Sequence, residues 1–373
     1  MNVKMKISHP QLFFFIVQTQ IGVGILSLSF SVHEEAGWDG WMSVFLGGIG
    51  IQLIILLLYA LSSRYPEHIL FHAMELIAGR LTGRLITTAY TIYFITVAIL
   101  VLVIYKNIIL TWLFPATPGW VIQLLLIISA WYLSREKLHI IVRFYVFVSA
   151  LFLLVVGVLL FALGDLNPLY IFPIGHHGIG PILKGVMAAM QAMLGFSVFM
   201  FIFPYIEYKK KRDVLKTATF ANLFTTAFYG ITVLITMMFF SPPELKLVPQ
   251  PLLYMLKTFS TPVIDRLDLI FLAMWIVSVT TSLMTYVYLA SLSGAHLLKG
   301  VKRKKLTLWT SGAIFFIAMG PTNNLTISKF AEGVDYFSIV MVIVIPLLLY
   351  LLSLIRGKPS SKGGQQHETT HSS

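Results

Sequence analysis

Long stretches without charge are the feature that most constrains what this chain can fold into. A helix needs about 20 consecutive apolar residues to cross the hydrocarbon core of a bilayer. Charged residues make up only 11% of the sequence, and they gather in short runs between such stretches. A soluble domain would carry roughly a quarter of charged residues. The sequence therefore predicts an all-α polytopic membrane protein and excludes an ordinary soluble domain.

Ten membrane spans are expected. They cover about residues 10–32, 40–63, 86–113, 119–134, 143–164, 181–205, 215–240, 268–298, 306–321 and 335–355. Two prolines and a glycine in Phe114–Gly119 favour a tight turn between the third and fourth spans. The apolar run Leu252–Leu256 predicts an interfacial helix lying on the membrane, and residues 66–79 predict a similar piece on the other side. Residues 357–373 have no large apolar side chain and are predicted to form a disordered cytoplasmic tail.

The basic residues are distributed unequally between alternate loops. One set of loops contains most of the 27 Lys and Arg residues, including the runs Lys209–Arg212 and Lys302–Lys305. The opposite set contains only Lys184, Lys246, Lys257, Arg266 and Lys329. The positive-inside rule then places both termini in the cytoplasm. The basic runs are explained as anchors facing anionic lipid, so no nucleic-acid partner is expected.

Ten spans divide into two sets of five, and the second set enters the membrane from the opposite side because five is odd. This is the arrangement of an inverted repeat. The first span of each set contains glycine near its middle, Gly22 and Gly24 in the first span and Gly195 in the sixth. Glycine costs a helix about 1 kcal/mol relative to alanine. We therefore expect both spans to be broken at these positions.

Two interpretations of the glycines remain open. Small residues let membrane helices pack closely, which would make the glycines structural. Glycine-interrupted spans at corresponding positions also mark the mid-membrane site of transporters, where freed N–H groups bind a carboxylate and freed carbonyls bind a cation or amine. The matching position of Gly195 favours the second interpretation.

Several short motifs resemble one known family. They are Gly22-Val23-Gly24-Ile25-Leu26, the following Gly37-Trp38-Asp39-Gly40-Trp41, Leu194-Gly195-Phe196 running to Pro204, and Trp275 with Thr280-Thr281. Together they resemble the membrane-embedded B subunit of spore germinant receptors over about residues 7–356. That family is similar to the amino acid–polyamine–organocation permeases, which share the 5+5 inverted-repeat fold of the bacterial leucine transporter. Many relatives carry an acidic residue after the span-six glycine, where this chain has Ser197.

The resemblance implies a ligand site between spans one, three, six and eight. The residues it places there are Gly22, Val23, Gly24, Ile25, Tyr93, Val97, Leu194, Gly195, Phe196, Thr280 and Thr281. Tyr93 and Val97 share a helix face because they are four residues apart, although Tyr93 could equally be a buried packing residue. The threonine hydroxyls could satisfy carbonyls of their own helix instead. In sodium-coupled relatives such hydroxyls join span-one carbonyls around the ion, which leaves room for sodium near Thr280 and Thr281.

Other polar residues give weaker signals. Lys106 is the only formal charge well inside an expected span, so it is either a functional charge or a side chain that reaches the outer headgroups past Leu110. His68 and His72 have the spacing of metal ligands but lie in a connector, and His176-His177 are expected to be solvated. No catalytic motif, nucleotide loop or thiol is present, so neither an enzyme nor a bound cofactor is expected.

Two functions follow from the resemblance. The first is a nutrient-sensing subunit in the spore inner membrane or cell membrane, which binds a small amino acid and signals to A- and C-type partner subunits. The second is an amino acid permease that uses the same site. Proton coupling normally needs a titratable acid inside the membrane, and the expected spans contain none in their interior. This absence disfavours the permease without excluding it.

Overall fold

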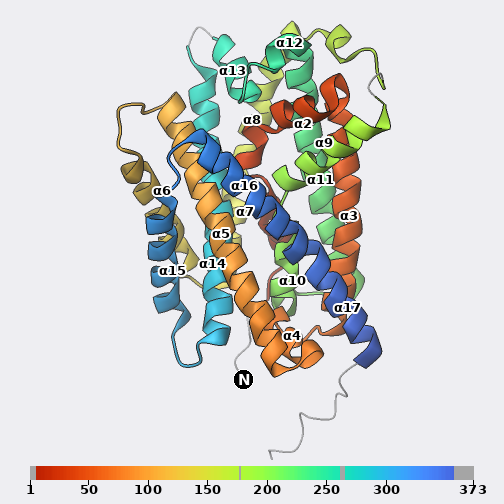
Figure 1. Ribbon diagram of the computed structural model, residues 1–373, viewed down its shortest axis with the longest axis vertical. Helices are drawn as coiled ribbons and strands as arrows, with labels where there is room; N and C mark the ends of the chain where they lie inside the picture. The colour runs from red at the N-terminus through yellow and green to blue at the C-terminus, as the bar shows by residue number, and fades with distance from the viewer. Residues whose placement is uncertain (1–5, 176–177, 261–264, 357–373) are drawn as a thin grey trace, which may run out of the picture.

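A computed structural model describes residues 6–175, 178–260 and 265–356. The tail 357–373 and His176-His177 lie outside the described residues. Most helices in Figure 1 run between two ends of the molecule. We call the lower one the basic end, because the segments with Lys209–Arg212 and Lys302–Lys305 lie there, and the upper one the opposite end.

The first five expected spans correspond to a series of helices, of which the first and fifth are interrupted. These are α1 (His9–Gln20), η1 (Val23–Leu26), α2 (Leu28–Ala36), α3 (Gly40–Arg64), α5 (Arg80–Trp112), α6 (Gly119–Ser134), α7 (Leu138–Val148) and α8 (Leu151–Leu160). The short elements between and after them are η2 (Gly37–Asp39), α4 (Leu70–Ala78), η3 (Phe161–Asp165) and η4 (Pro168–Ile171).

The second five spans follow the same order, with the sixth interrupted. They are α9 (Ile179–Ala192), η5 (Phe196–Val198), α10 (Phe199–Ile202), η6 (Phe203–Tyr205), α11 (Lys211–Phe239), α14 (Leu267–Leu297), α15 (Arg303–Ala318) and α16 (Asn324–Ile339), which continues through a π-helical segment η7 (Val340–Val344) into α17 (Ile345–Arg356). Two short helices, α12 (Pro242–Leu245) and α13 (Pro251–Thr258), connect α11 to α14.

Length and composition support membrane spanning for most of these helices. Among the described residues, 6 helical segments are long and apolar enough to cross a membrane, or 7 if α9 and residues 196–205, bent by 51°, form one span. The first expected span falls outside this set because it is interrupted. The helices α6 and α15 have 16 residues each, which is about 24 Å at 1.5 Å per residue and somewhat short of the hydrocarbon core.

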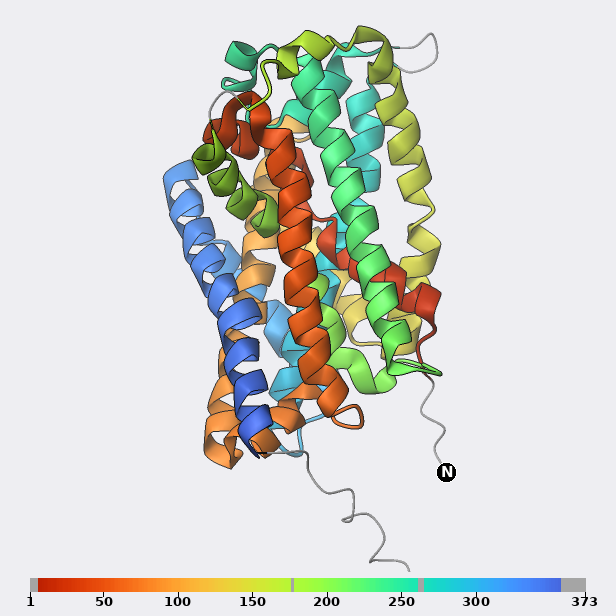
Figure 2. The same cartoon turned by 90° about the vertical axis from the view of Figure 1, so that its right-hand side faces the viewer.

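The helix contacts repeat when span numbers are shifted by five. The first span packs through α1 against α11 of the seventh, and the sixth packs through α9 against α3 of the second. The pairs α3–α11, α5–α14 and α6–α15 each join a span to its own counterpart. Figure 2 shows α3 and α11 running side by side along the height of the molecule. The expected 5+5 inverted repeat with the first and sixth helices broken is the architecture of this chain.

The short connecting helices α4 and α13 also correspond, since each follows the second span of its half. They lie at the two ends of the molecule, α4 at the basic end and α13 at the opposite end (Figure 1). In α13, Leu252, Leu253 and Leu256 are fully buried because the helix packs against α11, α14 and η1. The apolar face of this segment thus covers the helix bundle, and its position at the membrane surface stays a prediction.

Residues before the first span pair with residues after the sixth. Ile7 and Ile206 form an isolated parallel bridge, in which the Ile7 N–H donates to the Tyr205 carbonyl at 2.7 Å and the Glu207 N–H donates to the Ile7 carbonyl at 2.9 Å. The α1 helix then begins next to Ser8, whose N–H donates to the side chain of Gln11 at 3.0 Å. The two broken helices are thus joined at the basic end.

Candidate functional site

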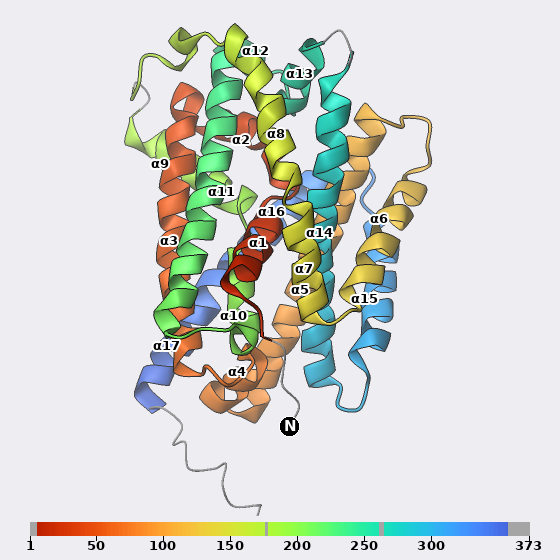
Figure 3. The same ribbon diagram turned by 180° about the vertical axis from the view of Figure 1, so that it is seen from behind.

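The first span unwinds where its glycines lie. The α1 helix ends at Gln20, Gly22 has φ −130° and ψ −135°, which is neither helical nor extended, and the chain resumes as a single 3₁₀ turn before α2. Figure 3 shows α1 entering the middle of the molecule between α11 and the α7–α8 pair. The break therefore lies within the helix bundle, at the level that the sequence predicted.

The sixth span unwinds at Gly195. The α9 helix ends at Ala192, and Gly195 has φ +123°, a conformation that side-chain-bearing residues rarely adopt. The following short helices contain Phe196, Phe199 and Phe201, each at most 1% exposed. The positive φ of Gly195 is incompatible with an α-helix, so the helix cannot continue through the break.

The two breaks touch each other through their glycines. A Cβ atom on Gly24 would lie 2.7 Å from the carbonyl oxygen of Ala192, and one on Gly195 would lie 2.6 Å from the carbonyl oxygen of Thr19. A Cβ on Gly22 would meet only the hydroxyl of Ser282, at 3.3 Å. Gly24 and Gly195 therefore allow backbone to approach backbone, and close packing accounts for both of them.

Side chains of α11 and α14 bind the carbonyl groups that the first break frees. The indole N–H of Trp275 donates to the Gly22 carbonyl at 3.2 Å. The hydroxyl of Tyr229 lies 3.2 Å from the Gln20 carbonyl and 3.4 Å from that of Ala192, so it touches both breaks. The hydroxyl of Ser282 donates to the Thr19 carbonyl at 3.2 Å. These buried carbonyls are hydrogen-bonded, as buried polar groups must be.

The two threonines expected near an ion are placed differently. The hydroxyl of Thr281 is buried, 2.9 Å from the side-chain oxygen and 3.4 Å from the backbone oxygen of Gln18. Thr280 donates to the Ile276 carbonyl at 2.7 Å within its own helix. The hydroxyls of Thr281 and Ser282 thus lie within hydrogen-bond distance of first-span oxygens, Thr281 near those of Gln18 and Ser282 near that of Thr19. Among the described residues no group of three His, Asp or Glu side chains could hold a metal ion.

A central cavity of about 330 Å³ lies beside both breaks. Small-molecule sites usually measure about 300–1,000 Å³, so this volume suits a small ligand. Its lining includes Thr19, Gln20, Gly22, Val23, Gly24, Ser27, Ser31, Val97, Leu100, Val101, Ile104, Ala188, Gln191, Ala192, Leu194, Ser282, Tyr286, Ala331, Val334 and Asp335. The cavity therefore draws on spans one, three, six, eight and ten.

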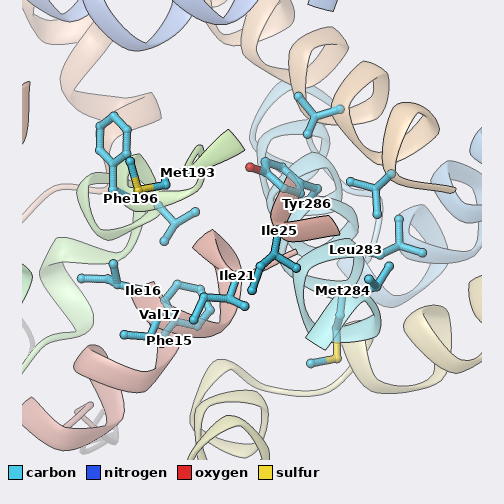
Figure 4. Close-up of a cluster of buried hydrophobic side chains, with 14 of the residues drawn as sticks. Phe15, Ile16, Val17, Ile21, Ile25, Met193, Phe196, Leu283, Met284 and Tyr286 are labelled. Atoms are coloured by element: carbon cyan, nitrogen blue, oxygen red, sulfur yellow. The ribbon is translucent and has the colours of Figure 1, made fainter. Parts of the chain in front are cut away.

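Five of the expected site residues line this cavity, namely Gly22, Val23, Gly24, Val97 and Leu194. Others lie just behind it. Ile25 is 3% exposed and packs among side chains of both breaks and α14, where Figure 4 shows it near Ile21, Leu283 and Tyr286. Gly195 contacts Thr19, and Phe196 lines a second, apolar pocket between α3, α9 and α16.

Tyr93 lies outside the central cavity. Its ring packs at 5.5 Å against Phe337 of α16 and at 5.6 Å against Phe94. It thus has the buried packing position that the sequence left open as an alternative. Thr280 and Thr281 also lie outside the lining, and their neighbour Ser282 takes the corresponding place because it is one residue further round the helix. Ser197 is buried on η5 and lines neither pocket.

Lys106 is buried, and its contacts described here are with residues outside both breaks. Its ammonium group donates to the Pro321 carbonyl at 2.9 Å, and its side chain packs against Gly119 at the start of α6. It therefore links α5 to the start of the fourth span and to the connection that follows the ninth. This contact pattern supports a structural role for the one charge that sequence analysis placed inside a span.

Sequence analysis missed the polar residues of the lining, which are Thr19, Gln20, Ser27, Ser31, Gln191, Ser282, Tyr286 and Asp335. Asp335 was assigned to the start of the tenth span because charges were used as span boundaries. The helix in fact begins at Asn324, where the side chain of Asn323 accepts the Thr326 N–H at 2.7 Å. Gly320-Pro321, with Asn323 two residues later, is a turn and N-cap signal that could have placed Asp335 inside the helix.

Comparison with known proteins agrees with this fold. Residues 6–327 match the family described as spore germination proteins. Spore germination protein GerQB of Bacillus cereus is 26% identical over 73% of this chain and 75% of its own length. Spore germination protein B2 of Bacillus subtilis (strain 168) is 25% identical over 95% of this chain and 96% of its own length.

A solved structure has the same arrangement of helices. It is the crystal structure of MhsT in complex with L-phenylalanine, with a TM-score of 0.66 and 14% sequence identity over 92% of this chain and 88% of that one. The likeness confirms the leucine-transporter type of fold, and the sequence match confirms the resemblance noted in the motifs at the two breaks. The chain belongs to the family of spore germination proteins.

Proposed function

We propose that this protein is the nutrient-binding membrane subunit of a spore germinant receptor and that its ligand is a small amino acid. The observation that carries the proposal is the 330 Å³ cavity lined by both broken helices and by three further spans. The solved structure with this fold was determined with an amino acid bound. A ligand held between the breaks can favour one arrangement of the broken helices over another, and so change what partner subunits contact.

Substitutions at Val97 test the cavity as a ligand site. Val97 lines the cavity and is 6% exposed. One methylene in an apolar pocket is worth about 1–3 kcal/mol in discrimination between ligands. Val97→Leu should therefore weaken the response to larger amino acids, and Val97→Ala should admit them. The measurement is the germination response of spores to a panel of amino acids, scaled to the amount of protein.

Val103 provides a matched control on the same helix. It is fully buried but does not line the cavity, so Val103→Ala should change protein level without changing the order of ligand preference. An unchanged preference order in both Val97 variants, at normal protein level, would contradict the proposed site.

Transport by the same cavity is the second candidate function. It is favoured by Asp335, because an acidic residue lines the cavity although the sequence predicted spans with no acidic residue in their interior. An intramembrane carboxylate is what proton coupling requires. Uptake of radiolabelled amino acids into vesicles containing this chain alone would support a permease. Binding without uptake, together with a requirement for A- and C-type subunits, would support the receptor.

We infer that the ligand site works without sodium. The hydroxyls of Thr281 and Ser282 lie at hydrogen-bond distance from the oxygens of Gln18 and Thr19, which a cation near Thr280 and Thr281 would need as ligands. Replacing sodium by choline in the medium should leave the ligand response unchanged. A loss of response in choline that sodium restores would show that these hydroxyls turn toward a bound ion.

The orientation also remains a proposal, with both termini in the cytoplasm and the basic end facing it. The excess of Lys and Arg in one set of loops supports it. A reporter at the C-terminal end should be active in the cytoplasm, and one inserted at 246–250 should be active outside. Two reporters active on the same side would overturn the ten-span topology. The spore inner membrane is the location that the family implies.

A further inference from the structure

Asp335 lies inside a membrane helix rather than at its end. The Asn323 cap fixes the start of α16 at Asn324, and Asp335 follows three turns later. From Asn324 to Arg356 the chain is helical over 33 residues and is apolar enough to cross a membrane. Ionisable side chains at such positions are costly and usually have a function.

The carboxylate lies at the depth of the two breaks. Asp335 lines the same cavity as Gly22 and Gly24 of the first break and Leu194 beside the second. Together with Leu194 and Gln191 it also borders the apolar pocket that contains Phe196. Asp335 therefore stands where the polar cavity meets an apolar pocket, which is the place a ligand with one charged and one apolar part would occupy.

Within residues 6–175, 178–260 and 265–356, no basic side chain forms an ion pair with Asp335. Other acids of the chain do have such partners, as Glu75 has Arg84 and Asp268 has Arg266. A carboxylate taken out of bulk water without a partner is unfavourable. The cavity therefore contains a negative charge whose counter-charge the described part of the protein does not supply.

We propose that Asp335 is the counter-charge for the ammonium group of the ligand. The cavity would then select amino acids and related organic cations over neutral molecules of the same shape. A hydrogen bond between an ammonium and a carboxylate is about twice as strong as one between neutral groups. This inference rests on the proposed function, because it concerns the ligand of the same cavity.

The test compares two probes that differ only in the group facing Asp335. The purified full-length protein is titrated with L-amino acids, and the one that binds best is compared with its 2-hydroxy acid, in which a hydroxyl replaces the ammonium group. Wild type should bind the amino acid at least about tenfold more tightly than the hydroxy acid, which corresponds to about 1.4 kcal/mol. In Asp335→Asn the ratio should fall close to one.

Glu332→Gln is the matched control, because it removes a negative charge from the same helix at an exposed position. It should retain the wild-type ratio, as should Asp335→Glu to within a few-fold. The ratio of two affinities does not depend on how much of the protein is folded. Asp335→Asn with a wild-type ratio would overturn the role of Asp335.

The failures of the two proposals can be told apart. If wild type binds an amino acid and Asp335→Asn keeps the same preference, the counter-charge is wrong and the amino acid site stands. If wild type binds no amino acid, the proposed ligand class is wrong and the role of Asp335 falls with it. If wild type binds the amino acid and hydroxy acid equally, Asp335 is not paired with the ammonium group.

Discussion

Polar side chains surround the first break, whereas aromatic ones surround the second. Gln18, Thr19 and Gln20 are buried before the first break, and α11 and α14 bind its carbonyls through Tyr229 and Trp275. The second break continues into buried phenylalanines. The carbonyls of Met193 and Ala192 at this break accept hydrogen bonds from the side chains of Gln20, at 3.2 Å, and Tyr229.

The comparison shows that corresponding helices can be broken for different physical reasons. The first break is held by hydrogen bonds to neighbouring helices, so its backbone can stay unwound beside a cavity. The second is held by packing and by one residue with positive φ. It also depends on the first, because two of its backbone contacts come from Thr19 and Gln20. Changes at the second break should therefore affect folding more than changes at the first.

Gly195→Ala should have the largest effect. The φ of +123° costs a residue with a side chain about 1–3 kcal/mol, and the Cβ would lie 2.6 Å from the Thr19 carbonyl oxygen, which adds about 1–3 kcal/mol of overpacking. The protein level in membranes and the melting temperature should both fall sharply. Gly312→Ala on α15, where a Cβ meets nothing within 4 Å, is the control. Equal levels for the two variants would remove the proposed asymmetry.

Gly24→Ala should come next, because its Cβ would lie 2.7 Å from the Ala192 carbonyl oxygen but its backbone needs no positive φ. Overpacking alone should cost about 1–3 kcal/mol. Because the clash is with the other break rather than with the cavity, stability should fall together with ligand response. A normal melting temperature with response lost would show instead that the added methyl group occupies ligand space.

Tyr229→Phe should have a smaller effect that reaches both breaks. Hydrogen bonds between membrane helices contribute on average about 0.6 kcal/mol and at most about 1.7. Tyr229 touches the carbonyls of Gln20 and Ala192, whereas Trp275 touches only that of Gly22. Thermal unfolding should therefore show a loss within this range for Tyr229→Phe. An unchanged melting temperature would mean that neither carbonyl depends on the Tyr229 hydroxyl.

Gly22→Ala should have the smallest effect on stability. Its Cβ would lie 3.3 Å from the Ser282 hydroxyl, which belongs to a side chain that can rotate, and Gly22 does not have a positive φ. We expect a change below about 1 kcal/mol, in line with single helix-propensity differences. A melting temperature as low as that of Gly24→Ala would show that the two glycines share one role.

Sequence analysis predicted the spans and both breaks because apolar length and paired glycines are strong local signals. It placed Gly22, Val97 and Leu194 beside the cavity through resemblance to a family, since one sequence does not show which helix faces meet. Tyr93 shows the limit of that approach, because it shares a helix face with Val97 yet its ring packs against Phe337. Small rotations of α5 and α16 decide which residue reaches the cavity.

Asp335 shows a different limit. When spans are defined as stretches between charges, an acidic residue inside a helix is always assigned to a helix end. The capping signal at Asn323 is local and readable, but it competes with a charge pattern that is usually reliable. The residue that departs from the general pattern is then the one most readily overlooked, although such departures are where function is expected.

The short connecting helices α4 and α13 have a consequence for how such a protein could arise. The α4 helix belongs to the first five spans and packs against α10 of the sixth, while α13 belongs to the second five and packs against η1 and α2 of the first. Each repeat thus contains a short helix that packs against the interrupted span of the other repeat. An ancestor with a single repeat could have covered its own break only by pairing with an upside-down second copy. If each repeat still depends on the short helix of the other, the chain can be divided between α8 and α9 into two fragments. These fragments should accumulate in the membrane only when they are co-expressed.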